Sequence, residues 1–369
     1  MRAELESAAA LDQRLASGTG LARTCLQSLD LTGRTPELLA AGIAGAVLLG
    51  CTLDPGADQL LVEAGALVFP RLPDLPFNPY RSGLYRPEEL YSRLDEGYQR
   101  SFDAGVYRWW QHHSRHRDLT AELAMTLHDY SVVDALEDNP VTAPVGVMGG
   151  HRSERGSTAY AEAVRLGREL AARGHTVFTG GGPGAMEAAA LGAALVGPWS
   201  EVEQALELLA RHPRFDTDAE TSEWARAAFE VRAGHRLTGP SIGIPTWVYG
   251  HEPPNAFSGG IAKLFSNAIR EDILLRLSTG GLVCLPGAAG TVQEIFQALT
   301  PRYYATGGTI PPLILLGIEH WTRQLPAWPL VEALALGREF AGRIHLCDSV
   351  DEVLALLERS MAVPKLRAA

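Results

Sequence analysis

The sequence of 369 residues predicts an α/β protein with a doubly wound parallel sheet. Two observations predict this fold class. From residue 145 onward, short apolar runs alternate with segments of helical periodicity, a pattern typical of βαβ units. In addition, two glycine-rich turns each join a predicted strand to the following helix, and such turns open at the edge where open α/β sheets bind ligands.

The strands and helices of this sheet can be predicted in chain order. Six strands is the number that we expect for a Rossmann-like domain, with right-handed crossovers between them. The predicted strands cover residues 145–148, 176–179, 242–248, 281–285, 313–316 and 343–346. The predicted helices cover residues 159–173, 185–195, 261–277, 292–299, 331–336 and 350–357.

Two further parts of the chain complete the predicted organisation. An insertion at about 197–239 carries two helical patterns, and we expect it to lie over one edge of the sheet. Before a division near residue 140, strand-like runs at 46–49 and 66–69 flank a short helix, and a mostly helical stretch follows. The prediction is therefore an N-terminal region at 1–140, either a small α/β lobe or a helical cap, and a Rossmann-like domain at 141–369.

Composition and charge exclude several classes of protein. The chain has 32 basic and 43 acidic residues, a net charge of −11, which disfavours binding to nucleic acid or an anionic membrane. The four cysteines are scattered without a CxxC pair, so neither a zinc site nor a disulfide framework is predicted. No signal peptide and no membrane span is recognisable. We therefore expect a cytoplasmic protein without metal, nucleic acid or membrane as a partner.

The first glycine turn reads TGGGPGAME from Thr179 to Glu187. Glycines let the backbone approach an anion, and the free N–H groups of the following helix favour negative charge. The turn also fits the relaxed dinucleotide fingerprint. It follows the second strand, however, and the acidic residues about 20 positions on (Glu201 and Glu203) lie in the insertion. NAD or FAD is therefore not the predicted ligand, and close packing of helix on sheet is the alternative role of these glycines.

The second glycine turn reads LPGAAGTVQE from Leu285 to Glu294. No Lys follows either turn, so the Walker pattern is absent and hydrolysis of a nucleoside triphosphate is not predicted. Thr291 and Glu294 also have the spacing of a capping box, in which the Glu side chain would fold back on the start of the helix. A functional and a structural interpretation of Glu294 therefore both stand at this point.

Taken together, a GGGxG turn and a PGxxGTxxE turn about 100 residues apart resemble the "lonely guy" family, whose members are often called lysine decarboxylases. The resemblance covers residues from about 145 to 350, and residues 180–187 look most like the subgroup that includes bacterial nucleotide 5′-monophosphate nucleosidases. Two positions depart from the family pattern. Ala288 stands where the family usually has Gly, and Glu271 replaces the Lys of an Arg-Lys pair.

The resemblance implies a nucleoside 5′-monophosphate phosphoribohydrolase, which cuts the N-glycosidic bond to give free base and ribose 5-phosphate. It implies that Glu294 faces the anomeric carbon, and that Arg270 orients the sugar or phosphate. It also implies a homodimer, no cofactor, and a nucleoside monophosphate or related phosphorylated ribose as the ligand. The residues implied in phosphate or nucleotide binding are Gly181, Gly182, Gly184, Met186, Glu187, Gly287, Gly290 and Thr291.

Structural alternatives stand beside these assignments. Arg270 would fit a solvated helix face, and Glu187 could be an acidic group favourable to a helix N-terminus. His251 and Glu252 follow a predicted strand and are candidates for contacts to base or ribose, or they belong to an ordinary turn. A rival function of another class is a nucleotide-binding or sensing module without turnover. The two departures, Ala288 and Glu271, favour this rival.

Overall fold

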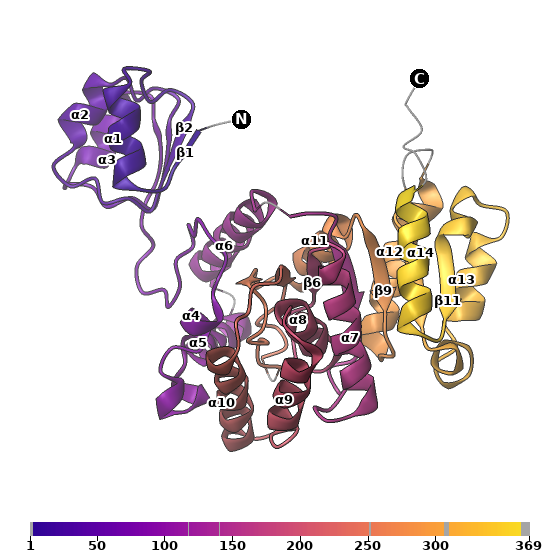
Figure 1. Ribbon diagram of the computed structural model, residues 1–369. Coiled ribbons are helices and arrows are strands. Elements are labelled where there is room, and N and C mark those ends of the chain that lie inside the picture. The colour runs from indigo at the N-terminus through magenta and orange to yellow at the C-terminus, as the bar shows by residue number, and fades with distance from the viewer. Residues whose placement is uncertain (1–2, 117, 140, 251, 306–309, 363–369) are drawn as a thin grey trace. The chain divides into compact units, whose positions relative to one another are not determined.

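A computed structural model describes residues 3–116, 118–139, 141–250, 252–305 and 310–362 (Figure 1). The chain forms two compact units, each built from two stretches of sequence. The first unit combines Met1–Leu84 with Trp109–Asn139, and the second combines Tyr85–Arg108 with Pro140–Ala369. Among the described helices, none combines the length and the apolar character that crossing a bilayer requires.

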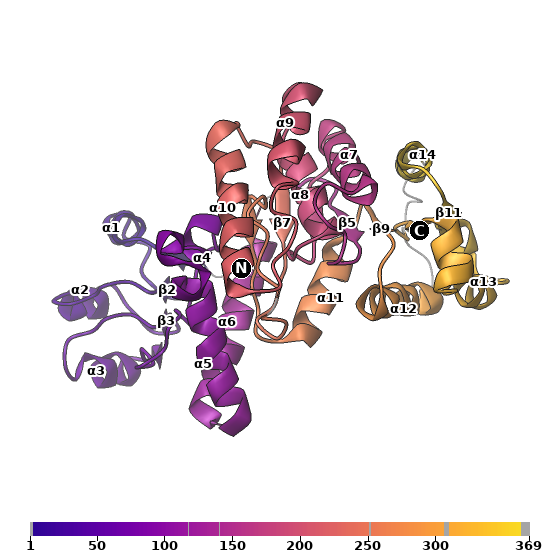
Figure 2. The same cartoon turned by 90° about the horizontal axis from the view of Figure 1, so that it is seen from below.

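The first unit contains a small parallel sheet of four strands in the order β1-β2-β3-β4. Right-handed crossovers between consecutive strands place α1, α2 and α3 on one face of this sheet, as Figures 1 and 2 show. The elements are β1 (Ala3–Leu5), α1 (Ala8–Ala16), β2 (Thr24–Gln27), α2 (Thr35–Ala40), β3 (Val47–Leu49), α3 (Ala57–Glu63), β4 (Leu67–Phe69) and α6 (Leu119–Glu137). The core side chains between sheet and helices include Leu11, Leu26, Leu38, Leu48 and Leu61, all fully buried.

The second unit is built on a parallel sheet of seven strands in the order β11-β10-β9-β5-β6-β7-β8. The strands are β5 (Val145–Met148), β6 (Val177–Thr179), β7 (Ser241–Gly243), β8 (Gly260–Ile261), β9 (Gly281–Cys284), β10 (Leu313–Leu316) and β11 (Ile344–Cys347). From β5 the chain places β6, β7 and β8 in turn on one side of the sheet. It then returns to place β9 on the other side of β5, and β10 and β11 follow outward. This doubly wound order confirms the predicted fold class.

Helices cover both faces of the larger sheet, so most of its strand residues are buried. The helices are α4 (Pro87–Leu90), α5 (Phe102–His116), α7 (Thr158–Ala172), α8 (Ala185–Ala194), α9 (Trp199–Leu209), α10 (Asp218–Gly234), α11 (Asn267–Leu277), α12 (Ala289–Tyr304), α13 (Trp328–Ala335) and α14 (Val350–Ala362). Short helical turns cover Leu94–Glu96, Tyr98–Arg100, His320–Gln324 and Glu339–Arg343. The insertion after α8 contains α9 and α10 (Figure 1).

The register of the sheet brings the two glycine turns to the same level. Val147 of β5 pairs with Thr179 of β6 on one side and with Val283 of β9 on the other. The chain therefore leaves β6 and β9 at neighbouring points of the carboxyl edge, on either side of β5. This is the place where the strand order reverses, and ligands of open α/β sheets bind there.

Two differences from the predicted elements lie near β7 and α11. The strand predicted at 242–248 ends at Gly243, because Pro245 cannot donate to a ladder. The helix predicted from residue 261 begins only at Asn267, where the Ser266 side chain accepts a hydrogen bond from the Ile269 N–H group. The short strand β8 takes up residues 260–261 instead, which local periodicity did not indicate.

A buried ion pair holds residues 85–108 within the second unit. The Asp103 carboxylate lies 2.6 Å from the Lys263 ammonium group, and it accepts hydrogen bonds from the Trp247 indole (2.9 Å) and the Tyr98 hydroxyl (2.8 Å). Burial lowers the pKa of Lys263, and the negative charge of Asp103 opposes that shift. The partners are far apart in sequence, so no local pattern predicts this contact.

Candidate functional site

Three loops at the carboxyl edge of the larger sheet are joined by backbone hydrogen bonds. The Ala185 N–H group, at the start of α8, donates to the Gly150 carbonyl at 3.1 Å. The Gly150 N–H group in turn donates to the Pro286 carbonyl at 3.1 Å. Gly150 follows β5, so its loop links the first glycine turn to the second. The two turns that the sequence singled out therefore lie side by side.

Gly184 is the residue of the first turn for which glycine is required. Its φ of +69° belongs to the left-handed region, and a Cβ atom there would lie 2.5 Å from the Gly150 carbonyl oxygen. Gly181 also has a positive φ, and its carbonyl accepts a hydrogen bond from the Asn255 N–H group at 2.8 Å. The first turn is thus held from both sides, by the loop after β5 and by the segment after β7.

The second turn leaves the start of α12 open. The helix begins at Ala289, and among the described residues no side chain caps it. Its first N–H groups, including those of Gly290 and Thr291, therefore have no intrahelical acceptor. Gly290 is exposed, whereas Thr291 is buried beside Gly287. An uncapped helix start next to a glycine turn is a favourable place for an anion.

The position of this helix start also decides between the two interpretations of Glu294. A capping box would require Thr291 as the N-cap residue, but Ala288 holds that position and α12 already includes Thr291. The capping interpretation is therefore wrong. The helix starts earlier than a capping box would require. Ala289 and Gly290 are its first residues, and they precede Thr291 and Glu294.

The departure at Ala288 does not strain the second turn. Ala288 has φ −120° and ψ −145°, so its φ is negative and open to any L residue. Its side chain is exposed rather than pressed against the loop.

We therefore expect the substitution Ala288→Gly to have little effect. The affinity for AMP, measured by isothermal titration calorimetry, should change by less than about two-fold, since an exposed and unstrained methyl group contributes within about 0.5 kcal/mol. A tenfold tighter complex in the variant would show instead that the Ala288 methyl group obstructs the ligand.

The structure places Arg270 and Glu294 in direct contact. The Arg270 Nη1 atom donates to Glu294 Oε1 at 3.2 Å, and its Nε atom donates to the Ile244 carbonyl at 3.0 Å. Both side chains are buried, with side-chain exposures of 10% and 8%. Arg270 therefore does not occupy a solvated helix face. Its guanidinium also lies beneath Gly180, whose added Cβ atom would be 2.8 Å from Nη2.

Glu271, the second departure from the family pattern, lies in the same contact group. Its Oε1 atom is 2.8 Å from Arg270 Nη1, and the Asn267 side chain donates to that oxygen at 3.5 Å. Glu271 is 4% exposed, and its Oε2 atom is buried without a hydrogen-bond partner among the described residues. The sequence marks Glu271 only as a departure from the family pattern, whereas the structure places it beside Arg270 and Glu294.

The surroundings of Glu294 favour its protonated form. Burial raises the pKa of Glu294 to about 7, the Arg270 guanidinium opposes the shift, and the negative charges of Glu271 and Glu252 add to it. A carboxyl group whose pKa lies near neutrality can exchange protons with a reacting molecule. Such shifts are typical of catalytic carboxyl groups, although structural networks also produce them.

Met186 and Glu252 border the first turn from the other side. The Met186 side chain is buried beneath Gly180 and Gly182, so it supports the loop. A Glu252 oxygen would lie 3.3 Å from a Cβ atom on Gly182, and Glu252 forms an ion pair with His151 at 3.1 Å. The neighbouring candidate His251 lies outside the described residues.

Glu187 is fully buried, and its carboxylate is bound within the protein. It pairs with the Arg155 guanidinium and accepts a hydrogen bond from the Tyr160 hydroxyl at 3.0 Å. Arg155 also donates to the Trp224 carbonyl at 2.9 Å and stacks over the Trp224 ring. Arg155 is a residue that sequence reasoning missed, because 32 positions separate it from Glu187 and no local motif joins them.

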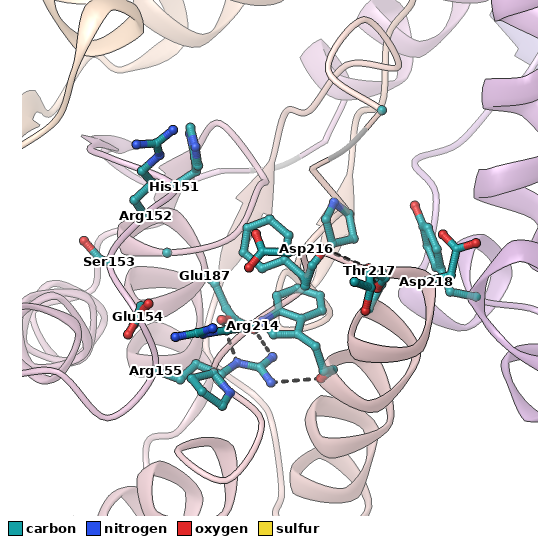
Figure 3. Close-up of a pocket in the computed structure, with 18 of the residues that line it drawn as sticks. His151, Arg152, Ser153, Glu154, Arg155, Glu187, Arg214, Asp216, Thr217 and Asp218 are labelled. Carbon is teal, nitrogen blue, oxygen red and sulfur yellow. Dashed lines mark hydrogen bonds and ion pairs between the residues drawn. The ribbon is translucent and has the colours of Figure 1, made fainter.

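A cavity of about 730 Å³ opens beside the first turn (Figure 3). This volume is typical of small-molecule sites. It is lined by Gly184 and Glu187, by the loop after β5, by the connection between α9 and α10, and by parts of residues 98–107 and 250–253. Arg270, Glu294 and the second turn are not part of its lining.

His320 is a further residue near the second turn that sequence reasoning missed. It belongs to the helical turn after β10, and its Nε2 atom lies 3.0 Å from the Gly287 carbonyl oxygen and 3.3 Å from the Gly287 nitrogen. The imidazole therefore holds the backbone of the turn. Only the folded sheet, in which β9 and β10 are neighbours, brings the two residues together.

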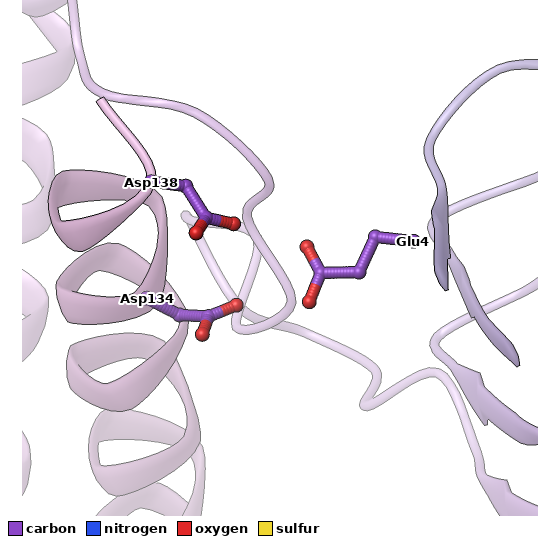
Figure 4. Close-up of side chains that lie close together, drawn as sticks. All are labelled: Glu4, Asp134 and Asp138. Carbon is purple, nitrogen blue, oxygen red and sulfur yellow. The ribbon is translucent and has the colours of Figure 1, made fainter. Parts of the chain in front are cut away.

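A cluster of acidic side chains lies in the first unit. Glu4 of β1 faces Asp134 of α6 and Asp138 at the C-cap of that helix, with carboxylate oxygens within 4.8 Å of one another (Figure 4). Burial and the neighbouring aspartates raise the pKa of Glu4. The three groups are exposed to solvent, and exposed acidic groups gather in this way without an ion.

Comparison with known proteins agrees with the resemblance of the two turns. Residues 142–200 match the SLOG cluster4 family, and residues 225–357 match the family described as possible lysine decarboxylase. No curated protein matches the chain.

Two solved structures resemble the chain at low identity. The molybdenum cofactor binding protein of the phototrophic bacterium Rippkaea orientalis is 20% identical over 59% of this chain and 97% of its own, with a TM-score of 0.37. The molybdenum cofactor carrier protein of Chlamydomonas reinhardtii is 21% identical over 59% of this chain and 98% of its own, with a TM-score of 0.36. Both segments that match these family models lie in the seven-stranded unit, which also carries the two glycine turns.

Proposed function

We propose that the chain is a nucleoside 5′-monophosphate phosphoribohydrolase, which releases free base and ribose 5-phosphate. One observation carries this proposal: the buried Glu294 carboxyl group is held by Arg270 beside the meeting point of two glycine turns. Anion-binding backbone and a carboxyl group with a pKa near neutrality are what cleavage of a phosphorylated riboside needs.

In this proposal the 5′-phosphate binds at the uncapped start of α12. The open N–H groups of Gly290 and Thr291 face it, and the helix dipole favours its negative charge. The glycines of the first turn, Gly181, Gly182 and Gly184, let the backbone approach from the opposite side. Binding energy at the phosphate, which is remote from the bond that breaks, orients the sugar for reaction.

Glu294 acts at the sugar. Cleavage of a ribosyl C–N bond passes through a centre with oxocarbenium character, as in glycoside hydrolysis. A carboxyl group at the anomeric carbon can stabilise this positive charge and exchange protons with water and the departing base. Arg270 keeps the carboxyl group in place from one side. The cavity beside Gly184 provides room for further parts of a ligand.

A second candidate function is nucleotide binding without turnover. The position of Glu271 favours it, because a carboxylate stands beside Arg270 where the resemblance predicts a Lys. In that case the glycine turns would bind the phosphate and the site would act as a sensor.

An assay with four nucleotides tests the proposal. The protein is incubated with AMP, GMP, CMP and UMP, and free base is measured by chromatography. We expect release from at least one of them, and release from the matching nucleoside roughly 100-fold slower, since the phosphate contacts would be lost. Binding of a monophosphate without release would favour the sensor. Neither binding nor release would contradict both functions.

A further inference from the structure

One nitrogen atom of Arg270 is shared by two buried carboxyl groups. Its Nη1 atom lies 2.8 Å from Glu271 Oε1 and 3.2 Å from Glu294 Oε1. Side-chain exposure is 10% for Arg270, 5% for Glu271 and 8% for Glu294. The three groups therefore interact with little screening by water, and the charge of each depends on the others.

The charges of this group do not balance. Two carboxylates and one guanidinium add up to −1 if both carboxyl groups are ionised. The described groups that act on Glu294 from other elements do not restore neutrality, because Glu252 after β7 is also acidic and burial raises the pKa of the Cys284 thiol on β9. A buried and uncompensated negative charge is costly, and burial together with the nearby carboxylates raises the pKa of Glu294.

The two carboxyl groups differ in their contacts with Arg270 and its neighbours. Glu271 has the shorter contact with Arg270, and the same oxygen also accepts a hydrogen bond from the Asn267 side chain. Its other oxygen is buried, and none of the residues that the structure describes donates a hydrogen bond to it. The negative charge of Glu271 therefore acts on Glu294, the neighbour on the same guanidinium, and favours protonation there.

We propose that Glu271 is a positioning residue that, through Arg270, favours the protonated form of Glu294 and so makes Glu294 the general acid of the hydrolysis. This inference rests on the proposed function. Glu294 gives its proton to the departing base nitrogen as the C1′–N bond breaks. A water oxygen then bonds to C1′, and a proton of that water returns to the Glu294 carboxylate. Base and ribose 5-phosphate leave, and the enzyme is restored.

The first test is the pH dependence of base release in Glu271→Gln. Because the acid must be protonated, kcat/KM of the natural protein should fall as pH rises through about 7. Glu271→Gln removes a negative charge that raises the pKa of Glu294. The pH at which kcat/KM falls should therefore be about one unit lower in the variant. At pH 7.5 the variant should then be roughly tenfold slower. The matched control is Asp272→Asn, which removes an exposed carboxylate from the next position of α11. It should leave the pH profile of kcat/KM unchanged.

The second test does not depend on activity. The pKa of Glu294 rises from 4.5 to about 7 in the folded chain, so the folded state binds its proton more tightly than the unfolded state. The stability that this group contributes is complete below pH 4.5 and is lost as pH rises through about 7. Urea titrations at several pH values measure the free energy of unfolding. We expect its decrease with rising pH to be smaller and to end at lower pH in Glu271→Gln, and this decrease to be absent in Glu294→Gln.

The outcomes separate the two proposals. Identical stability profiles in Glu271→Gln and the natural protein would overturn the coupling, whether or not base is released. Altered stability without base release by the natural protein would support the coupled pair and reject the hydrolysis. If Glu271→Gln does not fold, stability profiles of the natural protein and Glu294→Gln decide: without a difference between them, Glu294 takes up no proton in this range and the inference falls.

Discussion

Replacing Glu294 with Gln is expected to leave a folded protein that binds nucleoside monophosphate but releases base about 1,000-fold more slowly, within the range of 10² to 10⁴ that general acid–base groups contribute. Gln has nearly the same shape as Glu and can still contact Arg270 through its amide oxygen. It cannot donate and recover a proton as a carboxyl group does. The expected loss is therefore in kcat, with the affinity for nucleotide nearly unchanged.

Single-turnover release of base at pH 7, together with calorimetric binding of AMP, measures this effect. The matched control is Gln293→Ala, because Gln293 is exposed and precedes Glu294 on α12. We expect turnover within two-fold of the natural protein in the control, as for most exposed substitutions. Unchanged turnover in Glu294→Gln would remove this side chain from the mechanism. Loss of nucleotide binding would show that Glu294 serves the ligand rather than the reaction.

The second large effect concerns stability. Arg155→Met is expected to lower the free energy of unfolding by about 3–5 kcal/mol, because it leaves the Glu187 carboxylate buried without its cation. The same substitution removes the hydrogen bond to the Trp224 carbonyl and the stacking on the Trp224 ring. Arg155 joins the loop after β5 to α8 and α10, so its loss also loosens the wall of the cavity in Figure 3.

Urea denaturation at pH 7 measures the loss, and two variants serve as comparisons. Arg165→Met breaks an exposed ion pair with Asp351 and should cost less than about 1 kcal/mol. The double variant Arg155→Met with Glu187→Met removes both charges, and we expect it to be more stable than Arg155→Met alone. Equal stability of Arg155→Met and Arg165→Met would contradict the assignment of a buried, mutually dependent pair.

The sequence predicts the larger sheet well because its signals are local. Most of its strands are short apolar runs and the turns after β6 and β9 contain glycines, so alternation alone indicates the parallel order. The site follows from the same rule, since carboxyl ends of parallel strands share one edge. Glu294 and Arg270 could be named for this reason together with the family resemblance, and the structure places them 3.2 Å apart.

The sequence did not predict the buried ion pairs, because they depend on contacts between residues that are far apart in the sequence. The ion pair of Arg155 with Glu187 and that of Asp103 with Lys263 join residues on different elements, so only the folded chain brings them together. The strands β1 (Ala3–Leu5, with Glu4 in its middle) and β8 (Gly260–Ile261) contain no apolar run that would mark them as strands. The sequence did not indicate a role for Glu271 for a different reason. Comparison with a family pattern shows only that the expected Lys is missing at this position, whereas the structure shows that the negative charge of Glu271 raises the pKa of Glu294.

The interleaved course of the chain has a consequence for dissecting this protein. A fragment that begins at residue 141 would carry the whole seven-stranded sheet and both glycine turns. It would nevertheless lack Asp103, and the ammonium group of Lys263 would be left in an apolar interior with no counterion from that position. The second compact unit therefore starts upstream, at Tyr85, and a fragment meant to keep the counterion of Lys263 has to include the 24 residues from Tyr85 to Arg108.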